Sequence, residues 1–391
     1  MLSCGVVVEY NPFHNGHAFH LKESRRLSGA EAVIAVMSGN WLQRGEPAVI
    51  DKWARTRAAL ANGADLVVEL PFASAVQAAD YFAKGAIEIL HALHCDALCF
   101  GTDSSDSFDY AEFGRFTQEH AAAIQKTFQA YRNNGMKYPE QMRLVYEKLY
   151  PPFRQNKLGP NHLLALSYAK ENAKYQQPMT LFPLKRVGSG YHEKKLASSF
   201  ASATAIRKAL FEGKRAAIRE KVPTETFQSL MKANLASWED FWPYLRYVLL
   251  SQSPGQMRQI YQMVEGVEHR LIAQGKTAQH FADFCEKIKT KRYSQARLMR
   301  LCCYLLNQVS QTEINHAWRE PYLRILGFNA TGRAYLNEYK KKSALEIITQ
   351  PKKENRGLLA LAQKTDAVYY LGTAQNAADI PRYPIFERNS K

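Results

Sequence analysis

The chain has 391 residues, of which 46% are hydrophobic and 23% charged, and this balance is typical of a folded globular protein rather than a disordered one. No run of about 18 apolar residues occurs, which excludes a membrane-spanning helix. The formal net charge is +16, and residues 211–391 carry 28 Lys and Arg against 17 Asp and Glu, a net +11. This excess favours a polyanionic partner such as nucleic acid, although basic proteins that bind none are common.

The first residues, MLSCGVVVEYNPF, contain no basic segment before their apolar run. We therefore expect a first core strand and no signal peptide. Six scattered cysteines favour reduced thiols and a cytoplasmic location over a disulfide framework. The spacing His94-Cys95-x3-Cys99 could suggest metal ligands, but Ala97–Phe100 is typical of a buried strand, so no metal site is predicted.

The first predicted strand and helix are joined by a turn that contains two histidines. The β-branched run Val6–Val8 leads to Asn11-Pro12, and the histidines then flank a glycine in His14-Asn15-Gly16-His17. A helix N-terminus offers N–H groups and a positive dipole end, and imidazoles placed there can stabilise charge during phosphoryl or nucleotidyl transfer. Such a pair is also compatible with ordinary surface or core positions. The strand, turn and helix together favour the functional interpretation.

Strands alternate with helices over the first part of the chain. Strands are expected over Gly5–Glu9, Ala32–Met37, Leu66–Glu69 and Ala97–Phe100, and helices near His17–Leu27, Lys52–Asn62 and Ala75–Leu93. This order predicts an α/β fold with a doubly wound parallel sheet. Ligands of such sheets bind beyond the carboxyl ends of the strands. The predicted strand ends all carry turn or polar residues, which favours one shared site.

A dense polar segment follows the second predicted strand. It consists of Gln43-Arg44-Gly45-Glu46-Pro47 with Asp51, Lys52 and Arg55. One interpretation is a loop that closes over the shared site. The other is a solvated loop and helix face, and the sequence alone leaves both open.

Residues 103–160 are predicted to form a helical insertion, after which we expect a helix over Asn161–Ala169 and a strand over Leu181–Val187. From about Glu212 the pattern is almost wholly helical. We therefore predict a catalytic domain over residues 1–210 and a basic, mainly α-helical domain over residues 211–391. Helices in the second domain are expected over Phe241–Leu250, Met257–Ile272, Ala278–Thr290, Ala296–Val309 and from Gly332 onward.

A second motif, Ser202-Ala203-Thr204-Ala205-Ile206-Arg207, lies just before a predicted helix. Ser and Thr satisfy helix N–H groups, and the same geometry accepts phosphate. Arg207 adds a planar guanidinium fork that suits phosphate oxygens. In isolation this motif would be an ordinary N-cap followed by a surface arginine. Together with the two histidines upstream it favours a phosphate site.

These segments resemble a known family. HNGH and SATAIR are similar to the motifs of the His-x-Gly-His nucleotidyltransferase superfamily, whose Rossmann-like domain directs attack on the α-phosphate of a nucleotide. The blocks GVVVEYNPFHNGH, MSGNWLQRGEPAVIDKWARTRAAL, GADLVVELP and CFGTD resemble the bacterial tRNA(Met) cytidine acetate ligase family more closely. The resemblance is dense over residues 1–210 and looser at KTKRYSQARLMR and YLRILGFNATGRAYL.

The resemblance implies the positions of the ATP site. His14 and His17 would hold the nucleotide phosphates and act as catalytic residues together with Arg207, while Ser202 and Thr204 match the second phosphate-binding motif. The other positions that match the ATP site are Val7, Val8, Glu9, Tyr10, Asn11, Pro12, Phe13, Asn15, Gly16, Ala18, Phe19, His20, Gly101, Asn161 and Arg186.

The resemblance further implies a two-step reaction. Acetate attacks the α-phosphate of ATP, with Mg²⁺ expected beside the nucleotide, to give acetyl-adenylate and pyrophosphate. The N4 amine of the wobble cytidine of elongator tRNA(Met) then takes the acetyl group. Acetate needs no base to become a nucleophile, so positioning and cations should dominate catalysis.

Two other functions stay open at this point. The chain could be a nucleotidyltransferase that adenylylates a small phosphorylated metabolite, or an RNA-binding protein with an inactive nucleotide domain. The intact residues His14, His17, Ser202, Thr204 and Arg207 argue against the inactive domain. The acceptor separates the two enzymes, because only the ligase would release pyrophosphate with acetate and then modify RNA.

A basic run in the helical half is the predicted RNA contact. It consists of Lys287, Lys289, Lys291, Arg292, Arg297 and Arg300. Tyr293 lies within it and could stack on an unpaired base. The simplest interpretation of such a run is a solvated helix face. Beside an ATP site, and with the resemblance, contacts to the tRNA backbone are favoured. The residues predicted to make them are Lys289, Lys291, Arg292 and Arg297.

Overall fold

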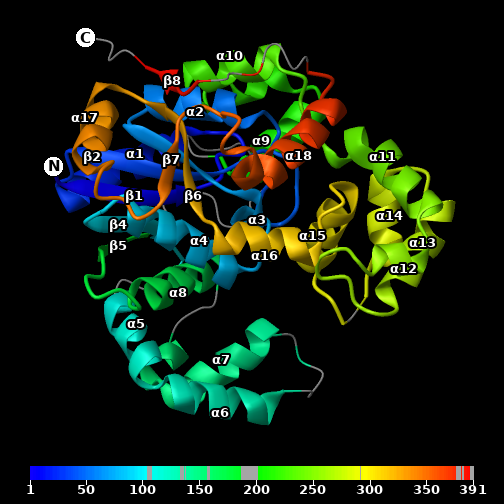
Figure 1. Cartoon of the computed structure of the whole chain (residues 1–391), viewed down its shortest axis with the longest axis horizontal. Coiled ribbons are helices and arrows are strands. Elements are labelled where there is room, and N and C mark those ends of the chain that lie inside the picture. Colours follow the sequence, from blue (N-terminus) through cyan, green and yellow to red (C-terminus); the bar gives the residue numbers. More distant parts are fainter. Residues whose placement is uncertain are drawn as a thin grey trace.

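The computed structural model describes residues 1–391 except for 104–107, 133–135, 137, 156–158, 186–200, 291, 376–379, 381–382 and 388–391. Its centre is one mixed sheet (Figure 1). The strands are β1 (Ser3–Val8), β2 (Ala32–Ser38), β3 (Leu66–Leu70), β4 (Ala97–Thr102), β5 (Thr180–Lys185), β6 (Tyr322–Phe328), β7 (Glu346–Ile348) and β8 (Ile385–Phe386). They follow the order β5-β4-β1-β2-β3-β6-β7, with β8 paired to β6.

The first five strands are parallel, which confirms the predicted α/β class. Val6 of β1 lies opposite Ala35 of β2 on one side and Cys99 of β4 on the other. Every residue of β2 and β3 is buried. Continuous apolar runs of this kind belong to parallel strands that are covered on both faces.

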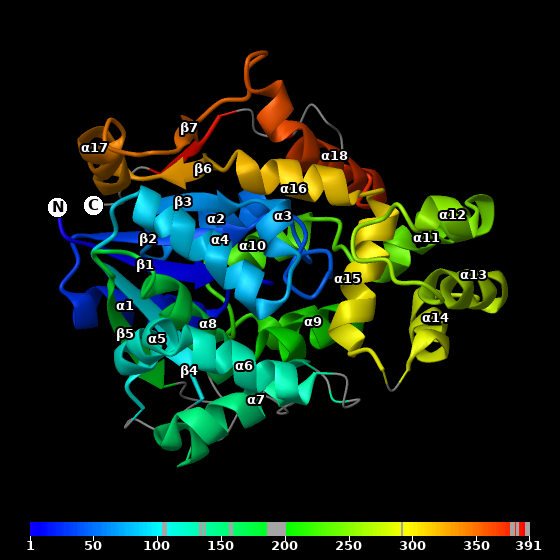
Figure 2. The same ribbon diagram turned by 60° about the horizontal axis from the view of Figure 1, so that its bottom comes forward.

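Helices cover both faces of the sheet and extend beyond it on two sides (Figures 1 and 2). The first half contains α1 (Asn15–Ser28), α2 (Lys52–Ala61), α3 (Phe72–Ala75), α4 (Ala79–Ala92), α5 (Tyr110–Glu119), α6 (Ala121–Tyr131), α7 (Tyr138–Leu149), the 3₁₀ helix η1 (Pro151–Gln155) and α8 (Pro160–Asn172). The second half contains α9 (Ala203–Phe211), η2 (Arg215–Ile218), α10 (Thr224–Lys232), α11 (Trp238–Ser251), α12 (Pro254–Met257), α13 (Val267–Thr277), α14 (Phe281–Ile288), α15 (Gln295–Leu306), α16 (Gln311–Arg319), α17 (Ala330–Tyr339) and α18 (Arg356–Gly372).

The alternation of side chains along the strands divides the core into two layers. Ile34 and Val36 of β2 pack on one face with residues of α4, α8 and α17. Val33 and Ala35 pack on the other face with residues of α1 and α2. The sheet is thus doubly wound, as predicted, and its carboxyl edge is left to the loops that build the site.

The predicted division at residue 210 does not separate the sheet from the rest of the chain. β6 joins the sheet beside β3 in antiparallel register, and β7 and β8 extend it. The core of the helical region, α11 and α13–α15, also contains Trp41 and Phe72 from the first half. In Figures 1 and 2, α15 lies between the sheet and α11–α14.

Two helices begin later than predicted. The expected helix Met257–Ile272 begins about ten residues later, because α12 ends at Met257 and α13 begins only at Val267, after Gly266 with a φ of 90°. Such left-handed backbone suits glycine and breaks a helix. The expected helix Ala75–Leu93 likewise begins later, because α3 ends at Ala75 and α4 spans Ala79–Ala92.

Candidate active site

The two histidines of the HNGH turn are held against each other where β1 leads into α1. His14 caps α1, and its Nδ1 accepts a hydrogen bond from Gly16 N at 3.0 Å. His14 N donates to Nδ1 of His17 at 3.3 Å, and the two rings stack with their centroids 3.7 Å apart. Because each Nδ1 accepts from the backbone, a neutral ring carries its hydrogen on Nε2, which is a donor that suits a phosphate oxygen.

Two buried aromatic residues next to the HNGH turn pack against it. Tyr10 and Phe13 are 1% and 0% exposed, and their ring centroids lie 4.6 Å apart in an edge-on arrangement. The Tyr10 ring also lies 4.9 Å from that of His17. Val8 is buried in the sheet. These predicted ATP-site residues therefore have core side chains, and only their backbone could meet a nucleotide.

The second motif is packed directly on the first. Ser202 caps α9, and its Oγ accepts from Ala205 N at 3.2 Å. Nη1 of Arg207 donates to the carbonyl oxygen of Asn11 at 2.7 Å, and Nη2 lies 3.6 Å from Oε2 of Glu46. The structure therefore brings Arg207 to the HNGH turn, while Thr204 is exposed on the first turn of α9.

Residues after α9 also reach the turn, which the sequence did not indicate. The backbone N–H of Asn15 donates to the carbonyl of Lys221 at 3.1 Å, and its side-chain Nδ2 donates to the carbonyl of Glu220 at 2.8 Å. The beginning of α1 is thus held by a segment that is far away in sequence. Ala18, Phe19 and His20 follow on α1 and are half-buried.

Gly101 and Asn161 lie at the end of β4 and the start of α8. Asn161 Nδ2 donates to the carboxylate of Asp103 at 2.9 and 3.0 Å, which ties α8 to the turn after β4. The next residue, His162, is buried and contacts Tyr110 OH at 2.8 Å. Burial lowers the pKa of His162 to about 4, so its ring is neutral. Arg186, the other residue predicted here, lies outside the described residues.

The polar segment after β2 is partly buried, since Arg44 is exposed whereas Lys52 and Arg55 are buried. Arg55 is fully buried, and its guanidinium donates to the carbonyls of Glu9 at 2.7 Å, Ser38 at 3.0 Å and Gly39 at 2.5 Å. It thereby joins the carboxyl ends of β1 and β2. Oε1 of Glu9 accepts from Gln43 N at 2.7 Å, and burial raises the pKa of Glu9. The interpretation as a solvated face is wrong for Arg55.

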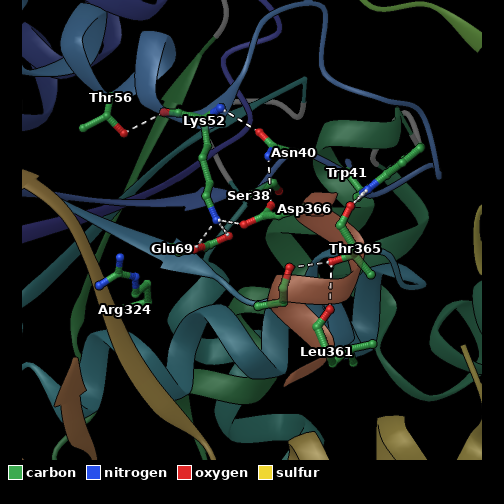
Figure 3. Close-up of polar contacts among 12 residues, drawn as sticks. Ser38, Asn40, Trp41, Lys52, Thr56, Glu69, Arg324, Leu361, Thr365 and Asp366 are labelled. Carbon is green, nitrogen blue, oxygen red and sulfur yellow. Dashed lines mark hydrogen bonds and ion pairs between the residues drawn. The ribbon is translucent and has the colours of Figure 1, made fainter. Parts of the chain in front are cut away.

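Lys52 is buried as well, in a cluster of charges that no sequence motif indicated (Figure 3). Its Nζ lies 2.8 Å from Oε1 of Glu69 in β3 and 2.6 Å from Oδ2 of Asp366 in α18. Asn40 completes the cluster, because its Nδ2 donates to Oδ1 of Asp366 and its Oδ1 accepts from Lys52 N, both at 2.8 Å. The cluster fixes α18 to the carboxyl edge of the sheet.

The basic run is not a helix face. Lys289 and Arg292 lie in the connection between α14 and α15, and Arg297 lies in the first turn of α15, while Lys291 is outside the described residues. The guanidinium groups of Arg292 and Arg297 lie 5.3 and 4.7 Å from the ring centroid of Tyr293. Lys289 pairs with Glu286 at 2.5 Å, and both side chains are exposed. Arg292 and Tyr293 also line a cavity of about 270 Å³.

Comparisons with known proteins show which family the chain belongs to. Residues 1–380 match the family model HIGH Nucleotidyl Transferase. The tRNA(Met) cytidine acetate ligase of Levilactobacillus brevis is 41% identical over 403 residues, covering 100% of this chain and 99% of that protein. The enzyme of the same name from Latilactobacillus sakei is 39% identical, covering 98% of this chain and 97% of that protein.

Two solved structures share the fold over the full length of both chains. The apo crystal structure of Thermotoga maritima TmcAL has a TM-score of 0.89 at 29% identity. The structure of the same protein bound with alpha-thio ATP has a TM-score of 0.85. The matched family model, the full-length identity and the shared fold together place the chain: it belongs to the tRNA(Met) cytidine acetate ligase family.

Proposed function

We propose that this chain activates acetate with ATP as acetyl-adenylate and transfers the acetyl group to N4 of the wobble cytidine of elongator tRNA(Met). The observation that supports this most directly is the contact of Arg207 with the backbone of the HNGH turn at Asn11. It brings a guanidinium and two stacked imidazoles to one strand end. This set of donors suits the phosphates of a nucleotide.

The first step requires little covalent work from the protein. Acetate is an anion at neutral pH and attacks the α-phosphorus, the bond to pyrophosphate breaks, and acetyl-adenylate forms. His14 and His17 would donate from Nε2 to phosphate oxygens, and Arg207 has five N–H donors, of which Asn11 engages one by hydrogen bond. Catalysis would rest on positioning and on charge stabilisation at these groups.

Mg²⁺ is proposed to enter with ATP. Among the described residues, no group of three His, Cys, Asp or Glu side chains is placed to hold a metal ion. The acidic side chains near the turn already have partners, since Glu46 lies beside Arg207 and Asp103 accepts from Asn161. Mg²⁺ commonly binds substrate phosphates and retains several waters, which suits such a site.

The second step needs an RNA substrate beside the adenylate. The N4 amine attacks the acetyl carbonyl, AMP leaves and the amine loses a proton. The connection between α14 and α15, with Arg292, Tyr293 and Arg297, is the proposed RNA contact, because it combines cationic groups with an aromatic ring. Within the described residues no helix has the length and apolar character needed to cross a membrane. Since ATP and tRNA occur in the cytoplasm, we propose a cytoplasmic location.

One experiment tests the proposal. The protein is incubated with ATP, labelled acetate and total tRNA, and the RNA is digested to nucleosides. We expect label in N4-acetylcytidine from elongator tRNA(Met), and pyrophosphate release that depends on acetate. Pyrophosphate release that does not depend on acetate but requires a phosphorylated metabolite would instead support the adenylylating nucleotidyltransferase.

A further inference from the structure

Arg300 is a buried cation without an ion-pair partner in the part of the chain that the structure describes. It lies on α15 with an exposed fraction of 9%, and its Nε is buried without a hydrogen-bond partner. The titratable groups that act on it most strongly are two tyrosines and two further arginines, Arg297 and Arg44. Burial, reinforced by these arginines, lowers the pKa of Arg300.

Arg44 reaches this place because its loop packs on α15. Gly45 has a φ of 81°, and a Cβ built on it would lie 2.7 Å from both Cα and N of Arg300. The loop, residues 39–51, is a tight one, since Leu42 N donates to the carbonyl of Glu46 at 2.9 Å. The close approach of the two backbones requires glycine at position 45 and places the neighbouring Arg44 beside α15.

Arg44, Arg300 and Arg297 connect the nucleotide site with the proposed RNA contact between α14 and α15. On one side, the same loop contacts the nucleotide site, because Gln43 N donates to Glu9 and Glu46 lies beside Arg207. On the other side, Arg297 lies over the ring of Tyr293 in the connection between α14 and α15. Figure 2 shows α15 standing between the sheet and the outer helices.

A buried guanidinium without a counter-charge is unfavourable, and an anion would offset this cost. The planar fork of arginine matches phosphate oxygens better than an ammonium group does. We propose that Arg300, with Arg44 and Arg297, binds a backbone phosphate of the RNA substrate between the adenylate site and the connection between α14 and α15. This inference rests on the proposed function, since it assumes an RNA substrate.

The test compares Arg300→Met with the charge-matched control Lys341→Met. Lys341 is exposed and follows α17, which lies at the far end of the sheet from α15 in Figures 1 and 2. Affinity for tRNA is measured at several salt concentrations. Loss of one phosphate contact should lower the salt slope by about one in Arg300→Met and by nothing in the control. Arg44→Met, a change at an exposed side chain that should not affect folding, is expected to act in the same direction.

Thermal unfolding separates this role from a structural one. Met has a similar length and carries no charge, so the melting temperature of Arg300→Met should equal or exceed that of the wild type. A clear decrease in melting temperature together with an unchanged salt slope in Arg44→Met would overturn the proposal. Inorganic phosphate is also tested as a competitor of RNA at constant ionic strength. It should displace RNA less effectively from Arg300→Met than from the wild type.

The remaining outcomes are distinguishable. The melting temperature is also measured with and without inorganic phosphate. If Arg300→Met keeps the wild-type salt slope but loses a stabilisation by phosphate that the wild type shows, the site binds free phosphate and the RNA contact is wrong. If neither changes, no phosphate binds there. If the slope falls as expected but the wild type does not acetylate RNA, the phosphate site stands and the proposed function fails.

Discussion

Nη1 of Arg207 donates to the carbonyl oxygen of Asn11 across 2.7 Å, and this contact joins two residues that are 196 positions apart. The position of the guanidinium is therefore set by the backbone of the HNGH turn as well as by α9. A substitution in either motif should therefore also displace the phosphate donors of the other, because the backbone of the HNGH turn positions both the histidines and Arg207.

Replacing Arg207 tests this arrangement. Arg207→Lys keeps the charge but loses the planar fork, so we expect acetate-dependent pyrophosphate release to fall about tenfold or more. The neighbouring Lys208→Met is the control, since Lys208 is exposed and pairs only with Glu212 at 3.5 Å among the described residues. Equal rates for Arg207→Lys and the wild type would show that Arg207 is not a phosphate ligand.

His14 has a structural role that must be separated from its chemical one. Because its Nδ1 caps α1, His14→Ala should cost about 1 kcal/mol of stability in addition to activity. His14→Asn keeps a good capping residue but removes the imidazole. We expect both variants to lose pyrophosphate release and only His14→Ala to unfold at lower temperature. Activity retained in His14→Asn would contradict a catalytic role.

Much of the first half of the fold follows from local sequence. The β-branched runs of β1–β3 and the turn before His14 predict strands, a helix start and a shared edge, and the structure has all of these. β6 is different, since Tyr322–Phe328 lies among helical patterns and finds its antiparallel partner β3 far back in the chain. No local pattern specifies such a long-range partner.

The burial of the charges could not be predicted for a similar reason. Lys52 begins a helix in a polar segment, and such a residue is normally solvated. Its burial depends on Glu69 and on Asp366, which lies 314 residues later. The carboxylate at position 69, inside the apolar run Leu66–Leu70, was the available signal. A charge in a fully buried strand requires a partner of opposite charge.

The stability of this cluster should depend on pH. Burial raises the pKa of Asp366 from 3.8 to about 6, against the opposing effect of Lys52. The native state then holds the proton of Asp366 more tightly than the unfolded state, so the contribution of this carboxyl to the free energy of unfolding should fall as pH rises from about 4 to about 6. Asp366→Asn removes this component. Chemical unfolding at several pH values measures it, and identical pH profiles for both proteins would contradict the assignment.

The connection between α14 and α15 provides the last prediction, because its cations are not equivalent. Lys289 already has Glu286 as a partner, whereas Arg292 and Arg297 lie over the ring of Tyr293. Neutralising Arg292 or Arg297 to Gln should therefore lower the salt slope of tRNA binding by about one each, and Lys289→Gln by less. Phosphate contacts carry no sequence information, so the loss should be similar for all tRNAs.

Substitutions of Tyr293 test whether this connection binds only phosphates or also stacks on a base. Tyr293→Leu removes both the platform for the two guanidinium groups and the aromatic face, whereas Tyr293→Phe keeps both. We expect Tyr293→Phe to bind tRNA like the wild type and Tyr293→Leu to bind an unpaired anticodon loop more weakly, by about 1–3 kcal/mol. If Tyr293→Leu and both arginine variants keep the wild-type affinity and salt slope, RNA does not contact this connection. RNA would then have to bind other basic residues of the region 211–391, which carries a net charge of +11.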